Sequence, residues 1–208
     1  MGTLLRVATF VALVLAARVS SADQIAVGDL IRFQESTGTL GGGAFLVDNT
    51  SNGEGVDFLT FCIQITQYIN YSDVFRVGGI TDFADDLGGN DPMSTATQWI
   101  FSTFRAGLLG EYSANEIQSA IWQLEGEWPG PVGQSDALIT LAQSAVTSGW
   151  VNDGVGVITL FDMNGNQAQD QLVQVPEPGT FALVGIGWVA LAGRKRLSDR
   201  RGPLPSLI

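Results

Sequence analysis

The sequence predicts an α+β fold in which antiparallel, barrel-like strands flank a central helical segment. Segments within residues 24–80 alternate apolar and polar side chains, as strands do, and residues 92–149 carry apolar side chains at helical spacing. Strand-like patterns return between residues 156 and 175. This order of strands, helices and strands is typical of α+β proteins with an antiparallel sheet and argues against a doubly wound fold.

Several segments in the first half of the chain have the pattern of strands. They cover residues 24–35, 44–48, 56–70 and 73–80. The third segment is the longest, and it places the side chains of Phe61 and Cys62 on opposite faces, because side chains alternate along a strand. The glycine-rich stretch 37–43, between the first two segments, is predicted to be a turn.

The first two helices are defined by the residues at their ends. Asp91 and Pro92 begin the first helix, since proline is tolerated at the first helical position, and Gly110 ends it. Ser113 and Glu116 form a capping box at the start of the second helix, because each side chain can bond to the other residue's backbone amide.

A third helix and two strands complete the domain. Ser135 caps this helix and Gly149 closes it. The two strands cover residues 156–162 and 168–175. Residues 162–170 are rich in oxygen donors but lack the EF-hand pattern, so calcium binding stays open.

The charge of the domain excludes some partners. Only three of the ten Lys and Arg residues lie between residues 23 and 175, namely Arg32, Arg76 and Arg105, whereas nearly all of the 21 acidic residues lie there. Such a surface repels polyanions, so we expect no nucleic-acid partner. The chain has no histidine, which removes the usual general base and most zinc sites. We therefore expect no cofactor, no enzymatic turnover and, apart from the open question of calcium, no metal centre.

The first 22 residues have the layout of a secretory signal peptide. Arg6 precedes an apolar stretch from Val7 to Ala17, and small residues end at Ala22, where we expect the cut. An uncleaved anchor is the alternative, but an apolar stretch of about 11 residues falls short of the roughly 20 that span a bilayer. The sequence therefore predicts an N-terminal signal helix within residues 1–22, which is removed after export.

The C-terminal segment, residues 176–208, continues a motif that begins one residue earlier. The motif consists of Val175, Pro176, Glu177, Pro178 and Gly179. An apolar run, 180–193, follows it. The basic tail, 194–208, begins with Arg194, Lys195 and Arg196. As a helix, the run of about 14 residues extends about 21 Å, short of the roughly 30 Å hydrocarbon core of a bilayer. The cations favour the cytoplasmic side, so we expect a short membrane helix with residues 23–175 outside the cytoplasm.

The order of these C-terminal parts resembles the PEP-CTERM sorting signal of bacterial exported proteins. The tail after the cations is longer than that family usually has. The resemblance implies that an exosortase in the inner membrane recognises the segment and cuts it at or near the Pro-Glu-Pro, and that the protein accompanies exopolysaccharide production. The protein is then tethered on the periplasmic side of the inner membrane before processing, and lies on the cell surface or in the extracellular matrix afterwards. An ordinary single-pass anchor is the alternative.

A second resemblance lies inside residues 23–175. The sole cysteine, Cys62, follows the aromatic Phe61 in an expected strand. The residues that match a second motif lie in the capped helix: Gln118, Ala120, Ile121 and Trp122. The two motifs resemble the thioester domain of bacterial surface adhesins, although Ile117 stands where that family usually has threonine. The resemblance implies an internal thioester between Cys62 and Gln118.

The chemistry of a thioester requires these residue types. The cysteine sulfur attacks the glutamine carboxamide and ammonia leaves, after which an amine or hydroxyl on another surface can take the acyl group. We expect Trp122 or Phe61 to exclude water, and the start of the helix to favour the Cys62 thiolate. The absence of lysine from residues 23–175 is consistent with a stored electrophile. A plain buried thiol is the alternative, since free cysteines usually behave as small apolar residues.

These inferences predict an exported surface or matrix protein that adheres covalently to extracellular polysaccharide or to amines and hydroxyls on a cell surface. The alternative is a passive structural or carbohydrate-binding matrix protein with no reactive bond. Its candidate sugar-stacking residues are the tryptophans Trp99, Trp122, Trp128 and Trp150.

Overall fold

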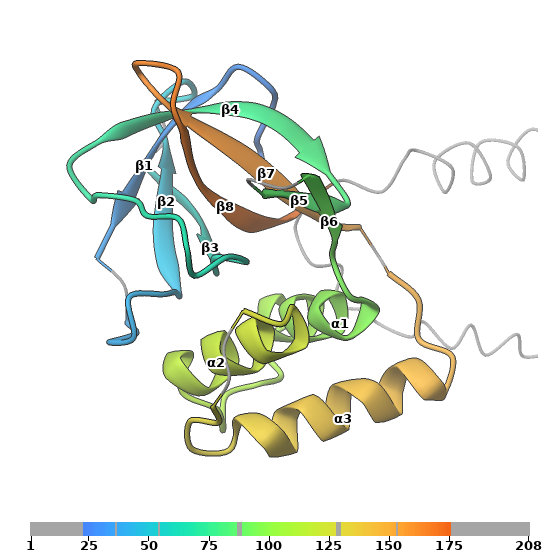
Figure 1. The fold of residues 1–208 in the computed structure, drawn as a ribbon. Helices are drawn as coiled ribbons and strands as arrows, with labels where there is room; N and C mark the ends of the chain where they lie inside the picture. Colours follow the sequence, from blue (N-terminus) through green and yellow to red (C-terminus); the bar gives the residue numbers. More distant parts are fainter. Residues whose placement is uncertain are drawn as a thin grey trace, which may run out of the picture.

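The computed structural model describes residues 23–175 except 36, 54, 87, 88, 128, 129 and 153. A curved antiparallel sheet lies over a layer of helices (Figure 1), which confirms the predicted α+β class. The predicted signal helix and the predicted membrane helix at 180–193 lie outside the described residues. None of the helices within the described part is long and apolar enough to cross a membrane.

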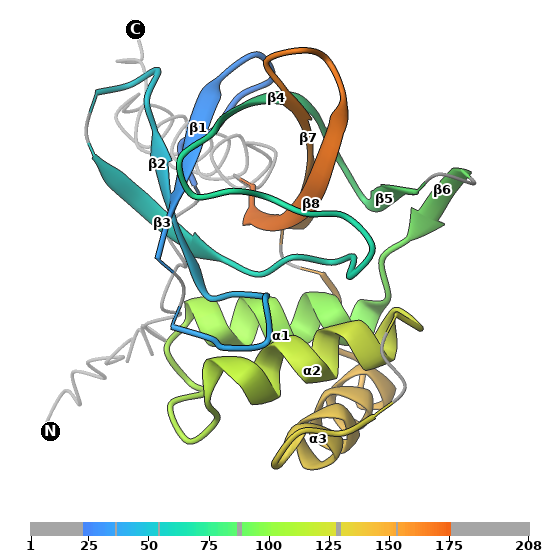
Figure 2. The ribbon, with the colours of Figure 1, turned by 60° about the vertical axis from the view of Figure 1, so that its left-hand side comes forward.

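The main sheet has six strands in the order β3-β2-β1-β4-β7-β8, and all neighbouring pairs are antiparallel. Their bounds are β1 Leu30–Gln34, β2 Phe45–Asn49, β3 Val56–Thr60, β4 Val74–Thr81, β7 Val155–Asp162 and β8 Gln167–Gln174. The sheet curls until its two edges approach each other (Figure 2). The chain after β3 meets β8 in a single bridge, Cys62 with Gln171, so the described strands do not close into a barrel.

The curl of the sheet is associated with a bulge in β4. The register between β4 and β7 shifts between Val77 and Gly79. A side chain at Gly78 would overlap the ring of Phe161, so only glycine fits at this bulge. This irregularity bends β4 over the apolar interior of the sheet.

Two apolar clusters share the strands and helices. Inside the curl, one cluster gathers residues that alternate along the strands, including Ile31, Phe33, Phe45, Val47, Phe75 and Val77. Between the sheet and the helices, the second cluster includes Phe61, Ile100, Phe101, Ile117, Ile121 and Leu138. Because Cys62 belongs to the first cluster and Phe61 to the second, the predicted opposition of these side chains is confirmed.

The helices are α1 Thr95–Arg105, α2 Ala114–Leu124 and α3 Ser135–Thr147. The predicted start of α1 at Asp91 and Pro92 is wrong. The helix begins after Ser94, whose side chain accepts a hydrogen bond from the Thr97 amide at 3.1 Å. The helix also ends earlier than predicted, at Arg105. Gly107, two residues later, has a left-handed φ of 72°, a conformation that is common just after a helix.

A small hairpin takes the place of the expected helix start. It consists of β5, Phe83–Asp86, and β6, Gly89–Pro92, which pair in antiparallel register. The sequence pattern does not predict it, because two strands of four residues that share three aspartates show no apolar alternation. Met93, just after β6, donates its amide to the carbonyl oxygen of Asp82 at 3.1 Å, which fixes the chain before α1.

The predicted capping box of α2 is confirmed. The Ser113 hydroxyl accepts from the Glu116 amide at 3.3 Å, and the Glu116 carboxylate accepts from the Ser113 amide at 2.7 Å. Glu116 also accepts from the amide of Gln134 at 2.7 Å, which joins the start of α2 to the start of α3. Helix α3 begins at Ser135 as predicted, but the Ser135 hydroxyl accepts from the Val132 amide instead of capping the helix.

Candidate functional site

Cys62 lies just beyond the end of β3, in a segment that β8 holds in place. The Leu172 amide donates to the carbonyl oxygen of Phe61 at 3.0 Å, and the Ile63 amide donates to that of Asp170 at 3.2 Å. The predicted strand over residues 56–70 therefore ends as a strand at Thr60, and its continuation turns onto β8. This turn places the Cys62 side chain, 0% exposed, at the helical end of the sheet interior.

Helix α2 brings Gln118 against this cysteine. The Cys62 Sγ donates to the Gln118 Oε1 at 3.4 Å, and the Gln118 Nε2 donates to the Cys62 carbonyl oxygen at 2.7 Å. Gln118 is 0% exposed, like Cys62. The two residues named by the sequence analysis, 56 positions apart, are thus direct neighbours in a site that water does not reach.

Two glycines that the sequence analysis treated only as a turn complete the surroundings of Gln118. The Gly43 amide donates to the Gln118 Oε1 at 2.9 Å. At Gly42, a Cβ atom would lie 2.5 Å from the Gln118 Cγ, which is too close for any other residue. The carboxamide is therefore oriented, with its oxygen toward two donors and its nitrogen toward a carbonyl. The run Gly41-Gly42-Gly43 is the signal in the sequence that marks this close approach.

Burial dominates the protonation of the thiol. It raises the pKa of Cys62 to about 12, although hydrogen bonds from the Gly43 backbone and from the Trp122 side chain act in the opposite direction. Glu127 raises the pKa further through its negative charge. The expectation that the helix start favours a thiolate is therefore wrong, because desolvation of the sulfur outweighs it. At neutral pH the group is a thiol.

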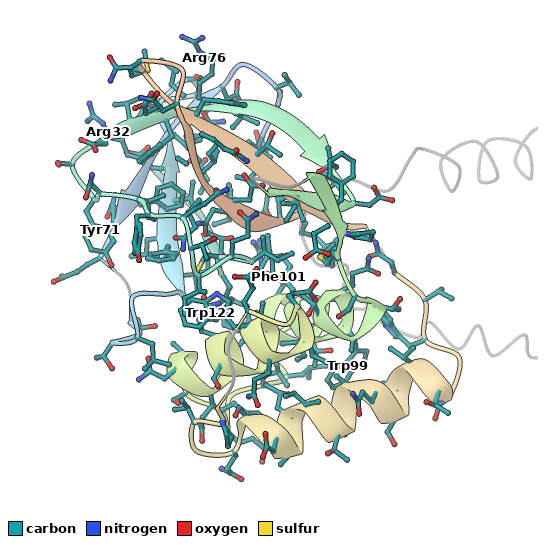
Figure 3. The ribbon with its side chains drawn as sticks, in the orientation of Figure 1. Arg32, Tyr71, Arg76, Trp99, Phe101 and Trp122 are labelled. Atoms are coloured by element: carbon teal, nitrogen blue, oxygen red, sulfur yellow. The ribbon has the colours of Figure 1, made fainter. Side chains whose placement is uncertain are left out.

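The predicted surroundings of the Cys62–Gln118 pair belong to two different apolar clusters. Trp122, one helical turn after Gln118, belongs to the same apolar cluster as Cys62, and is 1% exposed at the junction of sheet and helices (Figure 3). Ala120 and Phe61 belong to the other cluster. Phe61 packs edge-on against Phe104, with ring centroids 4.9 Å apart. Of the two aromatic residues, Trp122 is therefore the one on the same side as the Cys62 sulfur.

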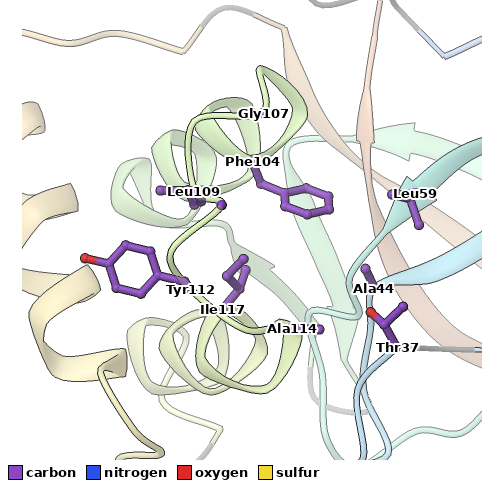
Figure 4. Close-up of a pocket in the computed structure, with 10 residues that line it drawn as sticks. Thr37, Ala44, Leu59, Phe104, Gly107, Leu109, Tyr112, Ala114 and Ile117 are labelled. Atoms are coloured by element: carbon purple, nitrogen blue, oxygen red, sulfur yellow. The ribbon is translucent and has the colours of Figure 1, made fainter.

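An apolar pocket of about 270 Å³ lies on the helical side of these residues (Figure 4). Its lining includes Ala44, Leu59, Phe104, Leu109, Tyr112 and Ile117. Ala44 follows Gly43 in the chain and Ile117 precedes Gln118. The pocket therefore lies next to the hydrogen bond between Gly43 and Gln118, because its lining includes a chain neighbour of each residue.

The other residues considered in the sequence analysis lie elsewhere. Trp99 and Trp150 are half-buried, and Trp99 packs against the helical cluster, whereas Trp128 lies outside the described residues. At the turn between β7 and β8, the Asp162 carboxylate accepts from the Asn164 and Asn166 amides. Among the described residues, no group of three or more acidic or cysteine side chains is placed to hold a metal ion.

The described domain ends directly at the C-terminal motif. Val175 donates its amide to the Gly154 carbonyl oxygen at 2.7 Å, and the rest of the predicted signal, from Pro176, lies outside the described residues. Residues 174–196 match the family model of the PEP-CTERM protein-sorting motif. This match confirms the PEP-CTERM part of the resemblance, and it covers the Pro-Glu-Pro, the apolar run and the three cations.

The PEP-CTERM motif marks the protein as exported, recognised by an exosortase and processed at the membrane. No curated protein and no solved structure gives a significant match to the chain. The resemblance of the domain to a thioester domain therefore stays a prediction.

Proposed function

We propose that this exosortase-sorted protein adheres covalently to extracellular polymer or to a neighbouring surface through a thioester between Cys62 and Gln118. The observation that carries the proposal is the 3.4 Å contact between the cysteine sulfur and the carboxamide oxygen, with both side chains fully buried. Both polar atoms of the buried Gln118 carboxamide have hydrogen-bond partners. Its burial therefore leaves no polar atom unsatisfied, and its orientation beside the sulfur is fixed.

The bond forms without an external reagent. The sulfur adds to the Gln118 Cδ, the C–N bond breaks, and the thiol proton leaves with the amide nitrogen as ammonia. In the second step, an amine or hydroxyl of the target adds to the same carbon, the C–S bond breaks, and the proton of the attacking group passes to the sulfur. The target is then joined to Gln118 by an amide or an ester, and Cys62 is a thiol again.

Burial at this site supports storage of the bond rather than rapid turnover. Gly42, Gly43 and Trp122 at this site are all buried, which supports the exclusion of water from the Gln118 Cδ. The high pKa of Cys62 makes its sulfur a poor leaving group while the site stays closed. The domain between residues 23 and 175 contains no lysine, so no side-chain amine of its own competes with the target.

Intact mass spectrometry of the full chain tests the proposal. We expect the protein to lack about 17 Da, the mass of ammonia, and methylamine to open the bond and release one thiol. Cys62→Ala and Gln118→Ala each abolish the loss, whereas Gln123→Ala, on the same helix, retains it. An unmodified mass with a fully titratable thiol after denaturation would overturn the proposal.

A second candidate function is non-covalent binding of carbohydrate. Tyr68 is 80% exposed and Tyr71 is 49% exposed, both on the connection between β3 and β4. Exposed aromatic rings are suited to stacking on sugars, whereas Trp122, considered in the sequence analysis, is buried and unsuited. Retention on immobilised polysaccharide that Tyr68→Ala abolishes and Cys62→Ala leaves intact would favour this candidate.

A further inference from the structure

We propose that the Gly43 N–H is a catalytic group of the thioester site, and that Gly42 is the positioning residue that allows it to act. The proposed charge acceptor is Gln118 Oε1, the oxygen that becomes negative during acyl transfer. This inference rests on the proposed thioester. It assigns a chemical role to the glycine-rich stretch 37–43, which the sequence analysis treated only as a turn.

The geometry matches the requirement for stabilising an oxyanion. When sulfur adds to the Gln118 Cδ, the electron pair of the C=O bond moves onto Oε1, and the same happens when an amine adds to the thioester. The Gly43 amide already donates to that oxygen at 2.9 Å in the carboxamide, so a donor is in place at the atom on which the negative charge develops. Because both residues are buried, water does not weaken the interaction.

Space, not backbone conformation, requires glycine here. A Cβ at Gly42 would lie 2.5 Å from the Gln118 Cγ and 2.6 Å from its Cδ. A Cβ at Gly43 would lie 2.5 Å from the Thr60 carbonyl oxygen and 2.8 Å from the Phe61 ring. Neither glycine has a left-handed φ. Gly42 and Gly43 therefore fit between β3 and α2 only because they lack side chains, and this fit brings the Gly43 amide to the carboxamide.

The sharpest variant at this position is Gly42→Ala. The three heavy atoms nearest to its methyl group all belong to the Gln118 side chain, so the substitution displaces that side chain first. The matched control is Gly110→Ala, where a Cβ meets nothing within 4 Å. Ammonia loss is followed by mass spectrometry after cell-free synthesis of the full chain, and the rate of methylamine attack is measured on the product. We expect Gly42→Ala to slow bond formation by about 100-fold or more, and Gly110→Ala to behave like the wild type.

A backbone substitution keeps the test decisive if Gly42→Ala fails to fold. Glycolic acid in place of Gly43 replaces the N–H with an ester oxygen and leaves the shape nearly unchanged. We expect about 100-fold slower bond formation and methylamine attack from loss of this one donor, with an unchanged circular dichroism spectrum. Wild-type rates in the glycolic acid protein would overturn the oxyanion role. Absence of ammonia loss from the wild type itself would overturn the proposed thioester, which is a separate result.

Discussion

Asp23 and Gln174 form a pair of hydrogen bonds that joins the two ends of the described domain. The Asp23 amide donates to the Gln174 carbonyl oxygen at 2.7 Å, and the Asp23 carboxylate accepts from the Gln174 amide at 2.7 Å. Asp23 follows the predicted signal-peptide cut, and Gln174 is the first residue of the sorting-motif match. These two residues, 151 positions apart in the chain, therefore bring the predicted signal-peptide cut and the start of the sorting motif to one point on the domain.

Removal of Arg105 should destabilise this junction strongly. Its guanidinium lies 2.6 Å from the Asp23 carboxylate, with side-chain exposures of 14% and 1%, and it also donates to the Leu59 carbonyl oxygen at 3.1 Å. Arg105→Ala leaves the Asp23 charge buried without its cation, so we expect a loss of about 3 kcal/mol in the free energy of unfolding. The exposed Arg76 is the matched control, and Arg76→Ala should cost about 0.5 kcal/mol or less. Urea denaturation measures both, and equal losses would contradict the prediction.

The distance between the folded domain and the sorting motif should limit processing. Because Val175 is bonded to Gly154, the domain leaves no free chain before Pro176. We expect Gly-Ser-Gly-Ser inserted between Val175 and Pro176 to speed cleavage in cells that carry the exosortase, as measured by pulse-chase labelling. The same insertion between Asn164 and Gly165, in the turn between β7 and β8, is the control and should leave the rate unchanged. If both proteins are processed at the wild-type rate, access is not limiting.

The free thiol should make stability fall at alkaline pH. In Gln118→Ala the thiol cannot form the bond, and burial raises the pKa of Cys62 from about 9 to about 12 on folding. The folded state then holds the proton more tightly, so this stabilisation is complete below pH 9 and is lost as the pH rises toward 12. We expect a decrease of about 1.4 kcal/mol per pH unit in that window.

The double variant Cys62→Ala/Gln118→Ala is the reference for this pH effect, because it lacks only the thiol. Urea denaturation of both proteins between pH 8 and pH 11 gives the difference in unfolding free energy. A difference that does not change with pH would show that the thiol titrates normally in the folded domain.

Two surface hydrogen bonds should control how often the glycine-rich stretch opens. The Thr39 amide donates to the Asn115 Oδ1 at 2.7 Å, and the Asn115 Nδ2 donates to the Thr39 hydroxyl at 2.8 Å. Asn115→Ala removes both, so we expect about fivefold faster hydrogen–deuterium exchange in residues 37–43, equivalent to about 1 kcal/mol. Asn70→Ala, which removes a side-chain bond to Asp73 on another loop, should leave that exchange unchanged. Equal exchange in both variants would show that these bonds do not hold the stretch closed.

Local patterns in the sequence predicted much of the fold because they act over a few residues. The capping box of Ser113 and Glu116 determined the start of α2, and its apolar spacing determined which residues face the helical core. The pairing of Cys62 with Gln118 follows from a resemblance between short motifs rather than from the local pattern. The start of α1 was misplaced, because Pro92 suits both a helix start and the last residue of an edge strand.

The sequence alone determined the α+β order, the capped central helix and the C-terminal sorting motif, since each depends on residues adjacent in the chain. Only the tertiary structure decided that the chain after β3 turns onto β8, that Gly42 and Gly43 enclose the Gln118 carboxamide, and that Asp23 meets Gln174. These contacts join residues 56 to 151 positions apart, as for Cys62 with Gln118 and for Asp23 with Gln174. These contacts form only when the whole sheet curls and Trp122 is buried in the apolar cluster inside it. No short segment of the sequence specifies that arrangement.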